Sequence, residues 1–329
     1  MKNKHMTNLD NELPPPATPG LSWRPLGPAD LTAITALSAT CLAADGGLPL
    51  AATDAFAQPR YLPAAPGTTI GAFDADGRLV AAAAVQRADT AQEYRANIVG
   101  QVHPDYRRRG LGSFLLRWSV AQARALLAPC PDDRPRVLAL TSESLTETAI
   151  RLYTQHGFTQ QFAEDVMRRG LHTPLPDAPL PSGMTLVPWT PALAGTFFEV
   201  YEAAFRERPG YPGWSPEEWV AWVSDDEDFR PELSFLAYDG ARPTGFIVYS
   251  DRYISMVGVR PEWRARGIAS ALVVEVLRRV QASGGDHVLL DVNVNNPSAA
   301  RIYTQLGFGM IGRRARFVST LTLESSQSG

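Results

Sequence analysis

The spacing of apolar residues in the second half of the chain changes repeatedly between the period of a helix and that of a strand. Between residues 268 and 282 the side chains of Ile268, Leu272, Val276 and Val280 recur every four positions, which predicts an amphipathic helix. Apolar runs on either side of an Asp-Gly pair predict a hairpin of two strands. The whole pattern predicts helices at 196–206, 215–224, 268–282 and 297–306, and strands at 233–238, 244–250, 253–259 and 287–294.

Local signals mark the ends of two of these helices. Ser215 followed by Pro216 and Glu218 predicts an N-terminal cap with a capping box, and Gly307 predicts a C-terminal cap. The pair Asp76-Gly77 predicts a corresponding hairpin in the first half. Both halves therefore contain related elements.

The chain contains one internal repeat. Residues 151–158 and 301–308 agree at six of eight positions, and residues 102–112 and 259–269 form a second matched pair in the same order. Such ordered self-similarity indicates a duplicated domain. The proline-rich stretch 172–183 suits neither a helix nor a central strand, so it predicts a linker.

Length agrees with a duplication, because 329 residues allow two domains of ordinary size. The predicted organisation is a flexible lead-in at 1–20, a first domain at 21–175, a linker at 176–184, a second domain at 185–323 and a flexible tail at 324–329.

Composition excludes several classes of function. The chain has 31 basic and 34 acidic residues and a formal charge of −3, which does not favour nucleic acid as a partner. The two lysines are Lys2 and Lys4, so no internal lysine is available for Schiff-base chemistry with pyridoxal phosphate. Cys41 and Cys130 lack metal-ligand spacing and make no disulfide framework for a chain of this length. Without a signal peptide or an apolar run of about 18 residues, a cytoplasmic protein with no membrane partner is expected.

The strongest chemical signal lies between a predicted strand and a predicted helix. In residues 264–269, Arg-Ala-Arg-Gly-Ile-Ala, the N–H groups of the first helical turn have no partner within the helix. With the helix dipole, such a terminus favours a phosphate or diphosphate, and Gly267 lets the ligand approach the backbone. The arginines can add charge-assisted bonds to phosphate oxygens. A capping glycine also explains a lone match, but the sequence holds two copies with the same downstream partner.

These motifs resemble those of the GNAT acyltransferase superfamily, whose members use acyl-coenzyme A. The superfamily's loop Gln/Arg-x-x-Gly-x-Gly/Ala is matched by residues 107–112 and 264–269. Its later pattern Asn-x-x-Ala-x-x-x-Tyr-x-x-x-Gly-Phe is matched by Asn296, Ala299, Tyr303, Gly307 and Phe308. The resemblance covers nearly the whole chain. It implies an α/β (α+β) fold of two tandem domains, each with a mixed, mostly antiparallel, splayed sheet flanked by helices.

For the second copy the resemblance implies a complete acetyl-CoA site that requires no metal. Strand 253–259 would separate from the next strand, so that backbone groups of Val257 and Val259 pair with the pantetheine amides. The other implied cofactor contacts come from Arg264, Ala265, Arg266, Gly267, Ile268, Ala269, Ser270 and Asn296. Tyr303 would lie near the sulfur and protonate the departing thiolate. A tyrosine that only packs in the core would give the same local sequence.

For the first copy the resemblance implies a cofactor site whose catalytic role is open, because Thr146 replaces the asparagine of the pattern. Tyr153 occupies the place of Tyr303 in this copy. The implied cofactor contacts come from Val102, Arg107, Arg108, Arg109, Gly110, Gly112 and Ser113.

An attacking amine must lose a proton to a base. The strand 253–259 contains no carboxylate, and Asp251 just before it is the candidate base, acting through a water molecule. Asp251 between Ser250 and Arg252 also fits an ordinary turn residue.

Two functions of different classes remain open. In the first, the second copy transfers an acyl group, taken as acetyl, from acetyl-CoA to a primary amine of a small molecule by direct attack in a ternary complex. In the second, both copies bind acyl-CoA as a sensing module without catalysis. The full motif around Tyr303 favours the enzyme, as a monomer or homodimer. Acceptor specificity is expected from a group of mostly aromatic residues, Tyr201, Phe205, Glu207, Tyr211, Trp214, Trp219 and Trp222.

Overall fold

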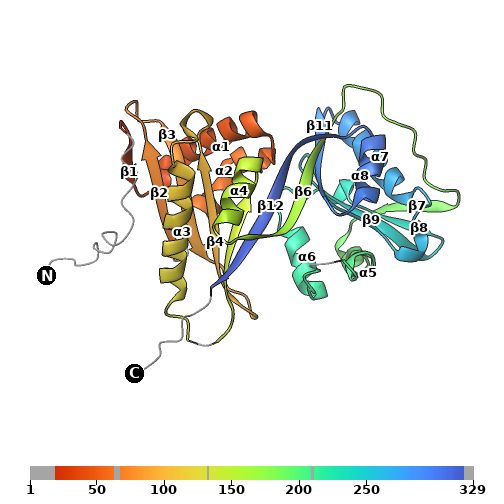
Figure 1. Cartoon of the computed structure of the whole chain (residues 1–329). Coiled ribbons are helices and arrows are strands. Elements are labelled where there is room, and N and C mark those ends of the chain that lie inside the picture. The colour runs from red at the N-terminus through yellow and green to blue at the C-terminus, as the bar shows by residue number, and fades with distance from the viewer. Residues whose placement is uncertain (1–18, 63–66, 132, 209–210, 322–329) are drawn as a thin grey trace. The chain divides into compact units, whose positions relative to one another are not determined.

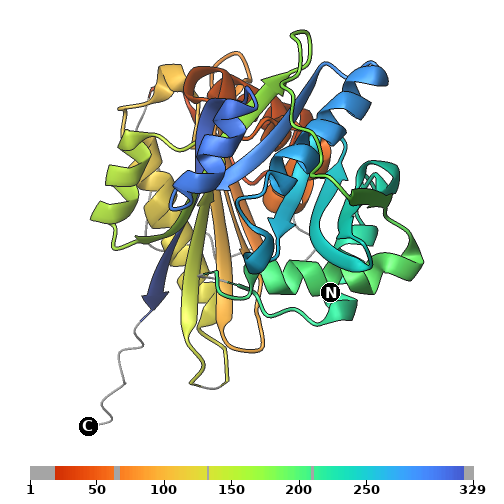
Figure 2. The same ribbon diagram turned by 90° about the vertical axis from the view of Figure 1, so that its right-hand side faces the viewer.

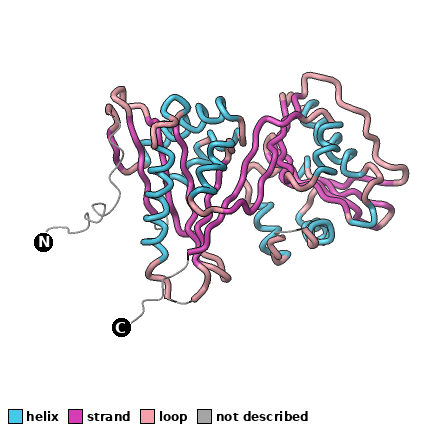
Figure 3. The backbone as a smooth tube through the Cα atoms, viewed as in Figure 1, coloured by secondary structure: helices cyan, strands magenta, loops and turns pink. Residues whose placement is uncertain are grey.

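A computed structural model describes residues 19–62, 67–131, 133–208 and 211–321. The chain divides into two compact units, and one of them is made of two separate segments of the chain. Unit 1 comprises Met1–Glu164 together with Gly312–Gly329, and unit 2 comprises Asp165–Ile311. Each unit is a mixed sheet covered by helices (Figure 3), so the expected α/β class is confirmed.

Unit 1 has the strand order β1-β2-β3-β4-β5-β12, with β6 next to β12 (Figure 1). From β1 to β5 and on to β12, neighbouring strands are antiparallel except for β4 and β5, which are parallel. Helices α1 and α2 pack against Ala82 and Ala84 of β3, and α3 packs on β3 and β4. The elements of unit 1 are β1 (Ser22–Arg24), α1 (Leu31–Asp45), α2 (Asp54–Tyr61), β2 (Gly67–Phe73), β3 (Leu79–Arg87), β4 (Tyr94–Val102), α3 (Leu111–Leu127), β5 (Arg136–Ser142) and α4 (Glu147–Gln155). Two strands belong to it in part: β6 (Thr159–Gly170) up to Glu164, and β12 (Gly309–Leu321) from Gly312.

Unit 2 repeats this plan with the strand order β6-β11-β10-β9-β8-β7. Residues of β9 alternate between two cores: Phe246 and Val248 pack with α5 and α6, whereas Ile247 and Tyr249 pack with α7 and α8. The strands are antiparallel from β7 to β10, and β10 is parallel to β11. The further elements of unit 2 are β7 (Met184–Pro188), α5 (Ala194–Phe205), α6 (Pro216–Ser224), β8 (Phe235–Asp239), β9 (Arg242–Ser250), β10 (Tyr253–Val259), α7 (Ile268–Ala282), β11 (His287–Asn293) and α8 (Pro297–Gln305).

Local sequence signals locate most of unit 2. Helix α6 begins after Ser215, whose hydroxyl accepts the Glu218 N–H at 3.2 Å while the Glu218 carboxylate accepts the Ser215 N–H at 2.8 Å, which confirms the predicted capping box. The strand predicted from Leu233 begins instead at Phe235, because Pro231–Leu233 forms a 3-10 turn. Strands β6, β7 and β12 were not predicted.

The C-terminal strand belongs to unit 1. From Ala315 to Leu321, β12 pairs antiparallel with Ser142 to Arg136 of β5, and the two strands lie side by side (Figure 2). The sequence-based division gave these residues to the second domain and placed the boundary in the linker 176–184, whereas the contacts place it between Glu164 and Asp165. Strand pairing is a long-range property, and neither the repeat nor the apolar pattern reports which sheet a strand joins.

Candidate functional site

The two repeated loops have the same backbone conformation. Gly110 and Gly267, which cap α3 and α7, both have φ of 83°, and Arg108 and Ala265 both have φ of 60°. A Cβ added to either glycine would meet no atom within 4 Å, so the space in front of each is open. Each helix makes its first bond back to its capping glycine, and the preceding N–H groups have no intrahelical acceptor. Both loops therefore offer a cradle of N–H groups that fits a diphosphate.

The first arginine of each loop ties the loop to its own unit. Arg107 donates to both carboxylate oxygens of Asp45 at 2.7 and 2.6 Å and to the Val102 carbonyl at 3.1 Å. Arg264 donates to the carbonyls of Val259 at 3.3 Å and Ala204 at 3.0 Å. The pairing with Asp45 raises the pKa of Arg107. These contacts give both arginines a role in holding the loop.

The arginine at the third position of each loop is engaged in a similar way. Arg109 donates to the Asp105 carbonyl at 2.9 Å, and Arg266 donates to the Glu262 carbonyl at 3.1 Å. The Arg266 guanidinium also lies over the ring of Trp263, 4.5 Å from its centroid. Direct contact of these guanidinium groups with phosphate stays a prediction.

Adjacent parallel strands separate ahead of the loop in both units. Pairing of β10 with β11 ends at Ile254 and Leu290, so Val257 and Val259 lie beyond the last pair. Pairing of β4 with β5 ends at Ile98 and Leu140, four residues before Val102. Within the described residues, β4 and β10 therefore each have one edge without a strand partner between the separation and the loop. The backbone groups of this edge suit the amides of an extended ligand.

A cavity of about 690 Å³, open to solvent, lies around the strand separation of unit 1. It is lined from β4, the loop, α1, α2, α3, α4 and the end of β5, and includes Val102, Arg107, Arg108, Gly110, Gly112 and Ser113. Tyr153 also lines it, and burial raises the pKa of this tyrosine while a hydrogen bond to Ser142 opposes the rise. All the predicted contact residues of the first copy except Arg109 therefore share one cavity.

The replacement of asparagine by Thr146 leaves the local fold intact. The Thr146 hydroxyl accepts the Ala149 N–H at 3.1 Å, and the Asn296 side chain accepts the Ala299 N–H at 3.2 Å. Both residues cap the N-terminus of the helix that carries the tyrosine, α4 or α8. Threonine and asparagine are both effective caps, so this substitution is no sign of a damaged helix.

Tyr303 of α8 is buried against the core beside the separated strand. Its side chain is 8% exposed, its ring meets Phe308 edge-on at 6.0 Å, and Val257 and Val259 pack against the same cluster. Burial raises the pKa of Tyr303 to about 12, which keeps its hydroxyl protonated at neutral pH. A protonated hydroxyl is what a general acid requires.

Asp251 lies in the exposed turn between β9 and β10, where its N–H donates to the Asp228 carbonyl at 2.8 Å. The turn is at the paired end of β10. Met256 just past the separation is five residues away, or about 16 Å along an extended strand. The role of Asp251 as a base stays a prediction, and the geometry favours the turn residue.

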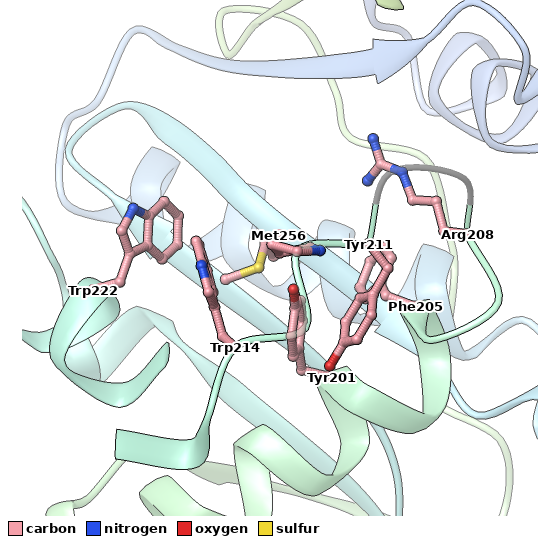
Figure 4. A pocket seen from close by; sticks show the side chains of 8 residues that line it. Tyr201, Phe205, Arg208, Tyr211, Trp214, Trp222 and Met256 are labelled. Carbon is pink, nitrogen blue, oxygen red and sulfur yellow. The ribbon is translucent and has the colours of Figure 1, made fainter. Parts of the chain in front are cut away.

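A small aromatic pocket lies on the α5 and α6 side of unit 2 (Figure 4). Its volume is about 190 Å³, and the Tyr201 and Trp214 rings in it are stacked with an interplanar angle of 23°. Its lining residues are Tyr201, Phe205, Arg208, Tyr211, Pro212, Trp214, Trp222 and Met256. Five of the seven residues expected to select the acceptor are among them, whereas Trp219 is fully buried and Glu207 does not line the pocket.

Sequence reasoning missed residues that reach the sites from distant elements. Asp45 of α1 holds the loop arginine, and Met256 of β10 forms part of the aromatic pocket. Neither lies in a recognisable motif. Across the described residues there is no group of three His, Cys, Asp or Glu side chains that could hold a metal ion. None of the helices in that part of the chain has the length and apolarity of a membrane span.

Family models match both copies of the repeat. The model described as the acetyltransferase (GNAT) family matches residues 197–308, and that described as the acetyltransferase (GNAT) domain matches residues 66–160.

Relatives resemble the chain over most of its length. The mycothiol acetyltransferase of Frankia casuarinae is 33% identical over 259 residues, covering 70% of this chain and 69% of the relative. That of Stackebrandtia nassauensis is 30% identical, covering 74% of this chain and 80% of the relative.

Two solved structures share the tandem fold. A GCN5-related N-acetyltransferase from Sphaerobacter thermophilus has a TM-score of 0.74 and 28% identity, covering 94% of this chain and 97% of that one. A tandem GNAT protein from the clavulanic acid biosynthesis pathway has a TM-score of 0.62 and 21% identity, covering 93% and 100%, which supports the fold alone.

Proposed function

Because this chain belongs to the GNAT acetyltransferase family and is an N-acetyltransferase that uses acetyl-CoA, we propose that unit 2 transfers the acetyl group to a primary amine of a small molecule. The transfer is a direct attack in a ternary complex. The observation that carries this proposal is the grouping along β10: the strand separation, the glycine-capped loop and buried Tyr303 all adjoin the same strand.

Acetyl-CoA is expected to bind in an extended form along unit 2. Its diphosphate would accept N–H bonds from the loop between Arg264 and Ser270, where Gly267 leaves open space. Its pantetheine amides would use the unpaired edge of β10 near Val257 and Val259. This arrangement brings the thioester to the strand separation, beside Tyr303.

The acceptor is expected in the aromatic pocket. Met256 lines the pocket and belongs to β10, so a molecule held there lies next to the strand that holds the thioester. No carboxylate is among the lining residues, so aromatic stacking would hold an uncharged part of the acceptor rather than an ammonium group. The relatives named mycothiol acetyltransferase support a small-molecule acceptor.

The chemical steps follow from these positions. The neutral amine attacks the thioester carbonyl, and the tetrahedral intermediate collapses with loss of the sulfur. Tyr303, kept protonated by burial, donates a proton to the departing thiolate and regains one from water. We propose that unit 1 binds a second acetyl-CoA in its cavity without contributing to turnover.

The test is acetyl-CoA turnover with a panel of primary amines, followed as free thiol and as acetylated product. Trp214→Ala and Trp222→Ala should raise the KM for the acceptor roughly threefold to tenfold, because each removes ring stacking, and should leave the KM for acetyl-CoA unchanged. Met310→Ala is a matched control, since Met310 is 54% exposed and lies outside the pocket. Binding of acetyl-CoA with no product from any amine would contradict the proposal and favour a sensing module.

A further inference from the structure

The amine must lose its proton during the transfer, and β10 carries no carboxylate that could receive it. The register of β10 against β9 shifts at Ser255: Ile254 pairs with Tyr249 and Met256 pairs with Val248, which leaves Ser255 as the extra residue of a bulge. This bulge comes directly after Ile254, the last residue of β10 paired with β11. Ser255 therefore lies where the two strands separate.

The Ser255 side chain begins a short chain of hydrogen bonds. Its hydroxyl lies 3.2 Å from the Ser250 hydroxyl, and Ser250 donates to the Oδ2 of Asp226 at 2.6 Å. Ser250 is 7% exposed, whereas Asp226 is exposed in the loop after α6. The chain thus leads from the strand separation, through a buried hydroxyl, to a carboxylate in contact with solvent.

We propose that Ser255, Ser250 and Asp226 form a proton relay that removes the amine proton in the acetyl transfer of unit 2. This inference rests on the function proposed above. Ser255 is the group that meets the substrate nitrogen, because the next residue, Met256, lines the aromatic pocket. Ser250 and Asp226 do not touch the substrate and accept the proton only by way of Ser255.

The proton balance closes without a further reactant. As the N–C bond forms, the nitrogen gives one proton to the Ser255 oxygen, Ser255 gives its own to Ser250, and Ser250 gives its own to Asp226. Asp226 then releases that proton to water. The C–S bond breaks, and the sulfur takes one proton from Tyr303, which is restored from solvent. One amine and one thioester give one amide and one thiol.

The surroundings hold Asp226 in place. Its Oδ1 accepts the Asp228 N–H at 3.0 Å, so its Oδ2 faces Ser250. The same loop carries the acidic residues Asp225, Glu227 and Asp228, and the turn after β9 adds Asp251. The cations of these segments are Arg230, which donates to the Glu227 and Phe229 carbonyls, and Arg252, whose N–H donates to the Tyr249 hydroxyl. Among the described residues, Asp226 forms no ion pair.

The experiment compares pH profiles of kcat in Asp226→Asn, Ser250→Ala and Ser255→Ala with the wild type. Each variant should lose roughly 10²-fold in kcat near pH 7 and recover part of it at higher pH, where hydroxide and buffer base replace the relay. Glu227→Gln, a neighbouring acid outside the chain of hydrogen bonds, is the matched control and should keep the wild-type profile. Ser255→Thr keeps the hydroxyl and should restore most of the rate.

Binding of two acetyl-CoA molecules per chain, measured by calorimetry, shows that unit 2 of a variant is folded as well as unit 1. A folded Asp226→Asn enzyme with the wild-type rate and pH profile would overturn the relay. Equal losses in Ser255→Thr and Ser255→Ala would overturn it as well, because the hydroxyl would then be irrelevant. A wild type that forms no product with any amine would instead contradict the proposed function.

Discussion

At the scale of single residues, the two copies differ in the surroundings of the matched tyrosines, Tyr153 and Tyr303. Tyr153 hydrogen-bonds Ser142 and packs edge-on against Phe317 at 5.1 Å. For Tyr303, no hydrogen-bond partner of the hydroxyl is present among the residues that the structure describes, and its pKa is raised by burial alone. A hydroxyl without a competing acceptor is available to a departing thiolate, so the difference favours catalysis in unit 2.

Tyr303→Phe should therefore lower kcat roughly 10²-fold while leaving the Kd of acetyl-CoA unchanged, because it removes one acidic proton and little volume. The measurement is thiol release at saturating substrates. In the wild type Tyr303 should cause no alkaline loss of activity below about pH 11, since its pKa is about 12. Tyr153→Phe serves as the control and should keep the wild-type rate. Full activity in Tyr303→Phe would remove the proposed acid.

At the scale of elements, β12 approaches the turn that follows α1 more closely than any side chain would allow. A Cβ on Gly312 would lie 1.9 Å from the backbone nitrogen of Gly47 and 2.6 Å from the carbonyl carbon of Gly46. The carbonyl of the next residue, Arg313, accepts the Leu145 N–H at 2.8 Å. Glycine at 312 is thus required by close packing of two backbones within unit 1.

Gly312→Ala should destabilise unit 1 by about 1–3 kcal/mol, because backbone atoms must move to admit the methyl group. Thermal unfolding of the full chain measures this as an earlier first transition. Gly309→Ala in the same strand is the matched control, since a Cβ there meets no atom within 4 Å. Equal unfolding temperatures for the two variants would show that the contact is easily relieved.

Local rules predicted those elements that carry their own signals. The Ser215 cap, the α7 periodicity and both glycine-capped loops follow from neighbouring residues, and the structure has each of them. Asp45, the bulge at Ser255 and the contact between Ser250 and Asp226 depend on strand register and helix packing, which local sequence does not encode. The conformation of the two glycine-capped loops was therefore predictable, whereas the proposed relay required the structure.

At the scale of the whole molecule, two loops of equal geometry belong to two units for which we propose unequal roles. We expect the wild type to bind two acetyl-CoA molecules per chain. Gly110→Glu and Gly267→Glu should each bind one, because a carboxylate enters the open space that each glycine leaves for a diphosphate. Turnover should be lost in Gly267→Glu and kept in Gly110→Glu.

Calorimetric stoichiometry and thiol release on the same samples test this expectation. Gly110→Ala and Gly267→Ala are the controls, since they share the strain of a left-handed backbone without the added charge. Loss of turnover in Gly110→Glu, with activity kept in Gly267→Glu, would place the catalytic centre in unit 1.

The position of β12 also affects how the two units can fold during synthesis. Unit 2 is one uninterrupted segment, Asp165–Ile311, so its part of the sheet comes from a single stretch of chain. Unit 1 is mostly translated earlier, but its sheet is complete only when Ala315–Leu321 has been made and pairs with β5. We therefore expect unit 1 to complete its sheet only after its last strand is made, and a chain cut before Ala315 to expose the edge of β5 to aggregation.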